Sequence, residues 1–356
     1  MKDFFAEQKS AICRYLEKYL MEKGNDLGRV HSMGTDSAER ILNFTEKGKM
    51  LRGGLVALAY LLTREKRTKG ALPESVTAAG AVMELFQSGF LIHDDIMDRD
   101  VKRRGIRSIF AQYGQFAQDN GIQDSYHTGE SLGICVGDIA FFLAFDILSG
   151  IEGRGVQSMI GLCAREISYV GVAQMMDVYW GQTSAGVNEG DILELYRYKT
   201  GRYTFSLPMM CGALLSGADT ARIKVLEEIG ELLGVVFQLK DDELGLFGDE
   251  NQLGKPIGSD ITEGKKTPFF LRLMERVTEE ERKKLLSYLG NDRMTGKDMD
   301  YIRNQVESLG IRREISDMCV NYADQARQRI GRIPDGDPAY RDILLEIIEY
   351  SLNRQK

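Results

Sequence analysis

The chain has 356 residues, of which 43% are hydrophobic and 28% charged, a balance typical of a folded globular protein. Its formal net charge of −7 at pH 7 argues against general nucleic-acid binding, which requires a broad basic surface. The five cysteines include no CxxC pair and only three histidines are present, so neither a disulfide framework nor a histidine-rich zinc site is expected.

The first twenty residues are amphipathic and charged, and they lack the hydrophobic region of a signal peptide. Downstream, no proline occurs between Pro73 and Pro208, and this interval is rich in Ala, Leu, Met and Glu. Within it, apolar residues recur every three or four positions, the period of a helix with one buried face: Ala79, Val82, Met83, Phe86 and Phe90. We therefore predict an all-α protein with a cytoplasmic location.

Short polar stretches separate the predicted helices. Residues 114–130 are interpreted as a polar connector between two helical patterns. Residues 132–148 form the most apolar stretch, but Asp138 and Asp146 interrupt it, so it is too short and too charged to span a bilayer. Because the chain has no internal repeat and no convincing linker, we predict a single domain over residues 1–356 without a membrane span.

The first acidic cluster is the strongest chemical signal in the chain. Asp94 and Asp98 are four residues apart, so on a helix they share one face, whereas Asp95 is turned off it. Two aligned carboxylates suit Mg²⁺ ions that bridge to diphosphate oxygens. The cluster follows an apolar run, which predicts a position at the rim of a cavity, and Arg103 and Arg104 follow as candidate anion binders.

A second acidic cluster lies near residue 241. Asp241 and Asp242 repeat the doublet, but the residue four positions beyond Asp241 is Gly245, and Asp249 comes two helical turns after Asp241. By itself this pattern is weak. It gains weight from residues 254–267, a segment rich in lysine and glycine that suits closure over phosphates.

Taken together, these segments resemble the trans-isoprenyl diphosphate synthases, or polyprenyl synthetases, and their pattern is most similar to prokaryotic geranylgeranyl diphosphate synthases. The similarity runs from Lys47 to Thr267, and its motifs occur in the family's order: GKMLR at 48–52, DDIMD at 94–98, RRG at 103–105, GD at 137–138, Gln174 with Asp177, KTGRYTF at 199–205, and DDELG at 241–245 with GKPIGSDITEGKKT. The resemblance implies an antiparallel helical bundle of the isoprenoid synthase type around a deep apolar cavity, assembled as a homodimer.

The resemblance also implies a role for each matching residue. Mg²⁺ ions that bind the allylic diphosphate would be held by Asp94, Asp98 and Asp241. The same diphosphate would be gripped by Arg103, Lys199 and Lys255. Isopentenyl diphosphate would be held without metal by Lys49, Arg52, Gln87 and Arg104. The reacting region would be lined by Gln174, Asp177, Thr200 and Gln238.

The chain departs from the family pattern at four positions. Met50 and Gly53 stand where the family often has arginine and proline. Gln87 stands at a position that is frequently histidine, and Gly245 replaces the third aspartate of the second motif. These departures affect mainly the details of the isopentenyl site.

The residue types suit the chemistry of a prenyltransferase. Breaking an allylic C–O bond leaves a cation and a diphosphate, whose charge Mg²⁺ and basic side chains stabilise as it develops. No dedicated base is evident, and the departing diphosphate is a plausible proton acceptor. Two alternatives remain: a class I terpene cyclase, disfavoured by Gly245 and by unexplained Lys49 and Arg52, and a modulatory synthase subunit, disfavoured by the intact first motif.

Product length is expected to depend on the helix that precedes Asp94. In the family, bulk at the fourth and fifth positions before that aspartate limits elongation, and these positions are Phe90 and Gly89. Phe86 is a further candidate for the floor of the cavity. One aromatic beside one glycine favours geranylgeranyl diphosphate, with farnesyl and geranylfarnesyl diphosphate as alternatives.

Overall fold

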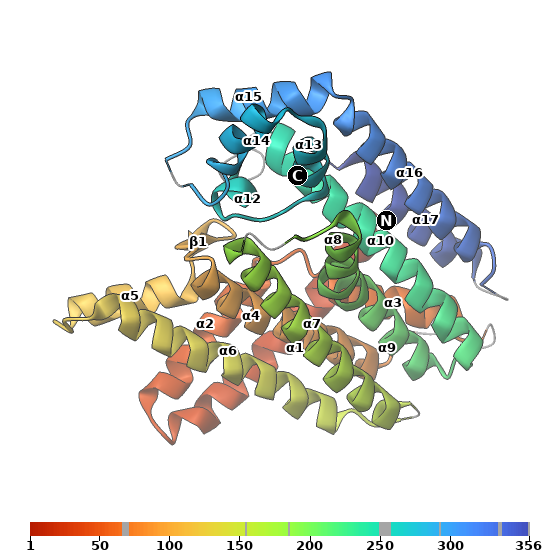
Figure 1. Ribbon diagram of the computed structural model, residues 1–356. Helices are drawn as coiled ribbons and strands as arrows, with labels where there is room; N and C mark the ends of the chain where they lie inside the picture. The colour runs from red at the N-terminus through yellow and green to blue at the C-terminus, as the bar shows by residue number, and fades with distance from the viewer. Residues whose placement is uncertain are drawn as a thin grey trace. The chain divides into compact units, whose positions relative to one another are not determined.

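The computed structural model describes residues 1–65, 71–153, 155–183, 186–248, 258–291, 293–333 and 337–354. Its helices are α1 Lys2–Gly28, α2 Ser32–Glu46, α3 Leu51–Thr63, α4 Glu74–Met97, α5 Ile109–Asp119, α6 Ser125–Gly150, α7 Val156–Gln182, α8 Glu189–Tyr196, η1 Arg197–Ser206, α9 Leu207–Ser216, α10 Thr220–Phe247, α12 Ser259–Thr262, α13 Pro268–Arg276, α14 Glu279–Leu286, α15 Gly296–Ser308, α16 Ile311–Ile330 and α17 Pro338–Asn353 (Figure 1). Across these residues the β-structure amounts to one hairpin, β1 Lys102–Arg103 and β2 Ile106–Arg107. The prediction of an all-α protein is confirmed.

The chain forms two compact units, and each is assembled from two stretches of sequence. The first unit comprises residues 1–160 and 208–219, and the second comprises residues 161–207 and 220–356. The chain therefore passes from one unit to the other at three places. Whether the whole chain acts as a single domain stays a prediction.

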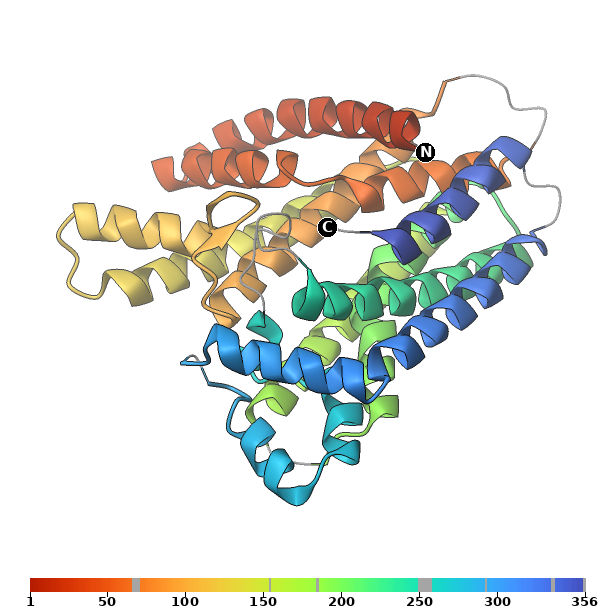
Figure 2. The same cartoon turned by 90° about the horizontal axis from the view of Figure 1, so that it is seen from above.

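In the first unit, α4 is the central helix. It begins after Pro73, whose ring is tolerated there because the first N–H groups of a helix have no intrahelical partner. Helices α1, α3 and α6 pack against it, and α1 and α2 lie side by side (Figure 2). Gly53 and Gly80 allow α3 and α4 to approach closely, since a Cβ on Gly53 would lie 3.0 Å from the Gly80 carbonyl oxygen.

The predicted polar connector at residues 114–130 is wrong, because most of it is helical. Helix α5 continues to Asp119, and α6 starts at Ser125 after Asp124, whose side chain accepts a hydrogen bond from the His127 N–H at 3.2 Å. The two helices pack closely at Gly129, where a Cβ would lie 2.5 Å from the Phe110 carbonyl oxygen. The packing overrides the polar composition of this stretch.

The hairpin follows directly from the end of α4. Arg99, with φ 57°, takes the left-handed conformation that stops the helix. Arg104 and Gly105 also have positive φ, 54° and 77°, and connect the two strands. Two positive φ angles in a two-residue loop are typical of a type I′ turn. Arg103 and Arg104 therefore lie on a hairpin and not on a continuation of the helix.

In the second unit, α10 is the central helix. Helices α8, α16 and α17 and the segment η1 pack against it, and Figure 2 shows α10 and α16 side by side. Several neighbouring helices begin with capping boxes; in α8, Asn188 and Asp191 each accept a hydrogen bond from the other's backbone N–H. Such reciprocal caps satisfy N–H groups that would otherwise lack partners.

The segment η1 is a π-helix of ten residues. Such helices are rare and often occur at functional sites. Its backbone touches α10 at two glycines: a Cβ on Gly234 would lie 2.0 Å from Gly201 Cα, and a Cβ on Gly230 would lie 2.4 Å from Ser206 N. Any larger residue at these positions would separate η1 from α10.

Two of the described helices, α4 and α6, are long and apolar enough to cross a membrane by length and composition. The core helix of a soluble protein passes the same test. In α4, 72% of the most apolar window is buried in the protein, against 44% in α6. Within α6, the Asp146 carboxylate accepts a hydrogen bond from the Tyr19 hydroxyl at 2.6 Å.

Candidate active site

The first acidic cluster occupies the last turn of α4. Asp94 lies inside the helix and Asp98 is its C-cap residue, whose N–H donates to the Asp94 carbonyl oxygen at 2.8 Å. The helical geometry therefore extends through Asp98, and the two carboxylates share one face as the sequence predicts. Both side chains are partly exposed, whereas Asp95 is fully buried.

Asp95 is held by the hairpin. The Arg103 Nε donates to Asp95 Oδ1 at 2.5 Å, and its Nη2 donates to Asp100 Oδ2 at 2.9 Å and lies 3.8 Å from Asp94 Oδ2. The second oxygen of Asp95 is buried without a hydrogen-bond partner among the described residues. Burial raises the pKa of Asp95 to about 7, although the nearby Arg103 charge opposes this rise.

The candidate isopentenyl site lies around the start of α3. Its N-cap residue, Met50, has a positive φ of 53°, and Lys49 and Arg52 stand on either side of it. The buried Glu84 of α4 accepts a hydrogen bond from the Gly53 N–H at 2.8 Å. Burial raises the pKa of Glu84, while the charges of Arg52 and Arg104 oppose the rise. Gln87 follows three residues later on α4.

Arg104, on the hairpin, is anchored to the end of α2, close to the start of α3. Its Nη1 donates to the Phe44 carbonyl oxygen at 2.9 Å, and its guanidinium lies 5.2 Å from the centre of the Phe44 ring. Gly48 lies directly beside it, since a Cβ there would be 3.0 Å from the guanidinium. The structure thus brings the predicted Arg104 next to the segment that carries Lys49 and Arg52.

In the second unit, the residues of the Lys-Thr motif contact α7 and α10. The Lys199 Nζ donates to Asp177 Oδ2 at 2.5 Å, and the Thr200 hydroxyl donates to Gln238 Oε1 at 3.1 Å. Gln174 lies on α7 three residues before Asp177. Five residues named from sequence motifs far apart in the chain therefore belong to one region of this unit.

The same region contains a buried carboxylate, Asp242, to which the sequence pattern assigned no role. Asp242 accepts hydrogen bonds from the Tyr196 hydroxyl at 2.6 Å and from the Gln238 amide at 3.2 Å. Burial raises the pKa of Asp242 well above its usual range, and the charge of Asp260 adds to the effect. Asp242 is thus a carboxyl group that the protein favours in its neutral form.

Asp241 points away from the buried position of Asp242 and is half exposed, with 51% of its side chain accessible. The Arg354 Nη2 donates to Asp241 Oδ1 at 3.0 Å, and the Arg354 guanidinium stacks 4.0 Å from the centre of the Phe237 ring. Asp241 therefore offers a carboxylate at the surface of α10, already paired with a cation.

Gly245 faces a carboxylate from the segment that follows α10. A Cβ on Gly245 would lie 2.9 Å from Asp260 Oδ2, and the Gly258 N–H donates to the Gly245 carbonyl oxygen at 3.0 Å. The position where the family has a third aspartate is thus occupied by the side chain of Asp260. Lys255 and Asp249 lie outside the described residues.

The candidate chain-length residues form an aromatic cluster with α6. The Phe90 ring lies 4.8 Å from Phe141, edge to face, and Phe86 lies 5.2 Å from Phe145. A Cβ on Gly89 would lie 3.0 Å from the Phe141 ring. Phe141 therefore touches Phe90 and Gly89, two of the three candidate floor residues, a contribution from another helix that the pattern along α4 could not show.

The remaining residues missed by sequence reasoning were Glu84, Tyr196, Asp260 and Arg354. Glu84 had a usable signal, since a single acidic residue inside an apolar helix must find a partner when it is buried. Asp260 lies in the GSDITEG segment, which the sequence predicts to close over phosphates without assigning a role to this aspartate. Nothing in the sequence links Arg354 to Asp241, because 113 positions separate them.

The carboxylates fit Mg²⁺ in number and type. Within the described residues, no group of three or more His, Cys, Asp or Glu side chains gathers as it would in an all-protein metal cage. Mg²⁺ usually takes only one or two carboxylates and completes its coordination with water and substrate phosphates. The paired Asp94 and Asp98, and separately Asp241, are suited to that kind of binding.

Comparison with known proteins supports the chemistry suggested by this geometry. A family model described as polyprenyl synthetase matches residues 38–306. The chain is 29% identical to a geranylgeranyl diphosphate synthase of Saccharolobus solfataricus over 317 residues, 88% of each chain. It is 32% identical to one of Sulfolobus acidocaldarius over 252 residues, 70% of this chain and 69% of that one.

A solved structure shows the same fold over almost the whole chain. It is the geranylgeranyl pyrophosphate synthase of Corynebacterium glutamicum, complexed with isoprenyl diphosphate and magnesium. The TM-score is 0.90 at 25% sequence identity, and the alignment covers 98% of this chain and 99% of the other.

Proposed function

Because the chain belongs to the polyprenyl synthetase family and is a head-to-tail prenyltransferase, we propose that it makes geranylgeranyl diphosphate from isopentenyl diphosphate and allylic diphosphates. The observation that carries the proposal is the pairing of Asp94 and Asp98 on the last turn of α4, within the region that the family model matches. The relatives named above support the product, since both sequence relatives are geranylgeranyl diphosphate synthases.

The allylic diphosphate is the group that both acidic clusters serve in this proposal. Asp94, Asp98 and Asp241 would hold Mg²⁺, which when bound supplies positive charge to the departing diphosphate. Lys199 and Arg103 add cationic donors, and Lys255 belongs to the same set by its position in the motif. Lys199 is already held at 2.5 Å by Asp177, which keeps its ammonium in place before substrate arrives.

Isopentenyl diphosphate would bind at the start of α3. Lys49, Arg52 and Arg104 supply cations for its diphosphate without metal, and Gln87 supplies an amide. The buried Glu84 carries the opposite charge beside Arg52 and fixes the first turn of α3 through the Gly53 N–H.

The allylic cation needs neighbours that neither react with it nor let water in. Thr200 and Gln238 hydrogen-bond to each other, and Tyr196 donates to the buried Asp242. Their polar atoms are therefore engaged with one another, which leaves oriented dipoles instead of free nucleophiles. The departing diphosphate is the acceptor that we assign for the final proton.

Product length would be set by the aromatic cluster of α4 and α6. Phe141 closes on Gly89 and Phe90, so truncating Phe141 to alanine should lengthen the products beyond geranylgeranyl diphosphate while costing stability through lost packing. Product masses from Phe141→Ala and from the native protein give the comparison, and Phe145→Ala tests the same effect at Phe86. An unchanged product from a folded, active Phe141→Ala variant would place the floor elsewhere.

The proposal also includes a soluble, cytoplasmic homodimer. Exposed apolar side chains on α7 recur at helical spacing, namely Tyr169, Val172, Met175 and Tyr179. Their accessible fractions range from 38% to 72%, and an exposed apolar patch of this kind is typical of a protein–protein interface. Sedimentation of the native chain and of Met175→Asp would test whether this stripe joins two copies.

One assay tests the function. The purified protein is incubated with Mg²⁺, isopentenyl diphosphate and each allylic diphosphate in turn, and the products are identified by mass. We expect a single dominant product of four isoprene units. Cyclic hydrocarbons from an allylic diphosphate alone would indicate a terpene cyclase, and activity seen only with an added synthase would indicate a modulatory subunit.

A further inference from the structure

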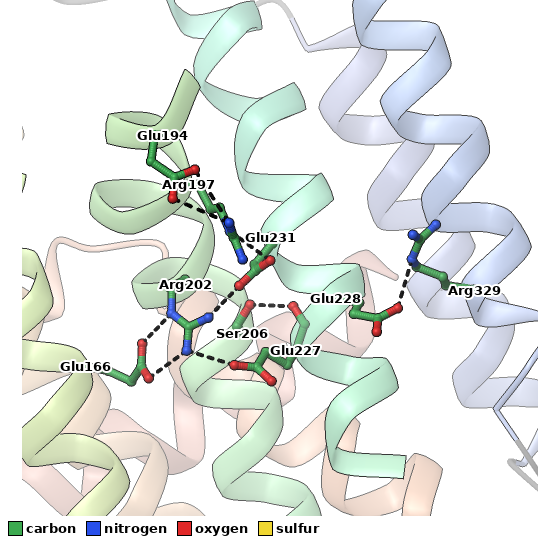
Figure 3. A network of polar contacts seen from close by, with 9 residues as sticks. All are labelled: Glu166, Glu194, Arg197, Arg202, Ser206, Glu227, Glu228, Glu231 and Arg329. Atoms are coloured by element: carbon green, nitrogen blue, oxygen red, sulfur yellow. Dashed lines mark hydrogen bonds and ion pairs between the residues drawn. The ribbon is translucent and has the colours of Figure 1, made fainter. Parts of the chain in front are cut away.

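The π-helix η1 carries Lys199 and Thr200, and an unusual charge cluster lies on the same segment. Arg202 is 9% exposed and makes four hydrogen bonds to three carboxylates (Figure 3). Its Nε and Nη2 bind both oxygens of Glu166 at 2.8 Å each, a bidentate arrangement. Its Nη2 also donates to Glu227 at 2.7 Å, and its Nη1 donates to Glu231 at 2.5 Å.

These bonds join η1 to the two helices that its substrate-facing residues also touch. Arg202 contacts α7 at Glu166, and Lys199 contacts α7 at Asp177. On α10 the corresponding contacts are Glu231 for Arg202 and Gln238 for Thr200. Arg202 and the pair Lys199 and Thr200 therefore fix η1 to both helices at two different levels.

A second cation completes the cluster. The Arg197 Nε pairs with the other oxygen of Glu231 at 2.9 Å, so this one carboxylate ties both arginines of η1 to α10. Ser206, at the end of η1, donates to the Glu227 carbonyl oxygen at 2.7 Å. The glycine contacts at Gly230 and Gly234 lie between these polar anchors. Anchors therefore hold η1 at its start, middle and end.

These anchors would keep η1 in its π-helical register. A π-helix closes i→i+5 hydrogen bonds and is less favourable than an α-helix unless its surroundings hold it. Removing one residue from the turn would rotate one part of η1 against the other by about 100°. Lys199 and Arg202 could then no longer reach their present partners together.

We propose that Arg202 is a positioning residue, which holds η1 in its π-helical register through Glu166, Glu227 and Glu231 and thereby places Lys199 and Thr200 for the allylic diphosphate. The inference rests on the proposed function for the role of Lys199. In this proposal Arg202 acts through the backbone of η1 and not through contact with substrate.

The chain offers a matched control for this clamp. Arg329 of α16 donates to Glu228 of α10 at 3.0 Å, an ion pair next in sequence to Glu227 but directed away from Arg202 (Figure 3). Arg329→Met therefore removes one arginine–glutamate pair from α10 and leaves the four hydrogen bonds of Arg202 in place. Arg202→Met and Arg202→Lys are compared with it.

The first measurement is amide hydrogen exchange in residues 197–206 of the substrate-free protein. Arg202→Met should exchange at least about 10-fold faster in this segment than the native chain, because the anchors hold its hydrogen bonds closed. Arg329→Met should leave the segment unchanged. Unaltered exchange in folded Arg202→Met would overturn the clamp, and this test stays valid even if the proposed reaction is absent.

The second measurement is a double-mutant cycle on kcat/KM for the allylic diphosphate. Misplacing Lys199 should cost on the order of 10²-fold in Arg202→Met, with the KM for isopentenyl diphosphate within about twofold of native. Adding Arg202→Met to Lys199→Ala should then cost almost nothing further, because both remove the same interaction. Arg202→Lys should recover part of the loss, and Arg329→Met should be as active as the native enzyme.

Independent, multiplicative losses in the cycle would show that Arg202 does not act through Lys199. Equal rises in both KM values would likewise refute the assignment. If Arg202→Met does not fold, because the buried Glu166 keeps, among the described residues, only the 3.3 Å contact from Arg165, Glu227→Gln carries the same cycle. This variant retains the bidentate bond between Arg202 and Glu166 and weakens only one anchor. We therefore expect a smaller loss of kcat/KM, which again adds almost nothing to the loss caused by Lys199→Ala. A native protein without prenyl transfer would refute the proposed function, but not the clamp.

Discussion

The two aspartate doublets of this protein have the same arrangement but differ in the partner that stabilises the buried carboxylate. In each doublet one carboxylate is accessible and its neighbour is buried, as Asp94 and Asp95 show on α4 and Asp241 and Asp242 show on α10. The buried Asp95 is met by the guanidinium of Arg103. The buried Asp242 is met by neutral donors, a tyrosine hydroxyl and an amide.

The sequence motif therefore specifies the outward carboxylates, and the surrounding structure determines how their buried neighbours are stabilised. The α4 doublet sits at a helix end, where the hairpin brings Arg103 back to Asp95. The α10 doublet lies inside a helix that continues to Phe247, so no such return is available and Tyr196 comes from another element. A charged partner and a neutral partner therefore stabilise equivalent positions.

The accessible carboxylates differ as well. Asp94 is accompanied on its own helix by Asp98, one turn further on, whereas four residues beyond Asp241 stands Gly245. Asp260 occupies that space from a later segment, and Arg354 pairs with Asp241. The first cluster is thus built from one helix, and the second is assembled from α10, α12 and the C-terminal residues.

The largest expected effect is the loss of kcat when a carboxylate of either cluster is removed. Asp94→Ala and Asp98→Ala should each lower kcat on the order of 10³-fold or more, since each removes a Mg²⁺ ligand from the same pair. Asp241→Ala should lower it less, on the order of 10²-fold, because the carboxylate of Asp260 leaves negative charge nearby. Steady-state rates, with circular dichroism to confirm folding, provide the measurement.

Near-native rates in Asp94→Ala or Asp98→Ala would contradict the metal assignment. A greater loss for Asp241→Ala than for the α4 variants would reverse the comparison, and α10 would then be the principal metal-binding element. Titration of the rate with Mg²⁺ distinguishes lost metal affinity, which excess Mg²⁺ recovers in part, from lost stabilisation of the leaving group.

A moderate effect is expected from giving α10 the aspartate that it lacks. Gly245→Asp places a third carboxylate against Asp260 and near Asp242, with its Cβ 2.9 Å from Asp260 Oδ2. The metal-free variant should be less stable than Gly245→Asn, which has the same size without the charge, by about 1 kcal/mol. Thermal unfolding in chelator measures this difference, and activity should change by less than about 10-fold.

Equal melting temperatures for Gly245→Asp and Gly245→Asn would show that Asp260 moves away from position 245 at no cost. A loss of activity greater than that of Asp241→Ala would show that the alignment of the second motif is wrong. Gly245→Asp in saturating Mg²⁺ should regain stability relative to its metal-free form, because a bound cation offsets the added repulsion.

The sequence predicts those parts of the fold and site that depend on local pattern. The helical period around Phe86 and the spacing of Asp94 and Asp98 both follow from the geometry of one helix, and α4 has them as expected. The family resemblance identified Lys199 and Thr200, although their π-helical setting stayed hidden, because composition does not distinguish i→i+5 from i→i+4 bonding.

What the sequence could not predict depends on contacts between distant segments. The hairpin at residues 102–107 is set by positive φ at Arg99 and Arg104, residues with no strong preference for that conformation. The helical character of residues 114–119 and 125–130 comes from the packing of α5 on α6. The partners of Arg202 and Arg354 are 25 or more residues away, beyond the reach of any local pattern.

The smallest expected effect is the change with pH in the contribution of the buried Asp95 to stability. The pKa of Asp95 is raised from its model-compound value of 3.8 to about 7, so between about pH 4 and pH 7 the folded protein binds a proton there that the unfolded chain has lost. The contribution of Asp95 to the free energy of unfolding therefore falls as pH rises through this window and is constant above it. Asp95→Asn, which cannot ionise, should lack this slope.

The measurement is the difference in melting temperature between the native protein and Asp95→Asn, taken in chelator from pH 4 to pH 8. We expect this difference to decline toward pH 7 and then level off. Asp36 provides a control of opposite sign. Burial alone would raise its pKa, but hydrogen bonds from Arg40 and Tyr113 outweigh burial and lower the pKa. The stability that Asp36 adds is therefore lost only as pH falls below about 4. A difference for Asp95→Asn that grew with pH would mean that the ion pair with Arg103 outweighs burial. The two doublets would then differ more than their geometry indicates, with an ionised carboxylate inside α4 and a neutral one inside α10.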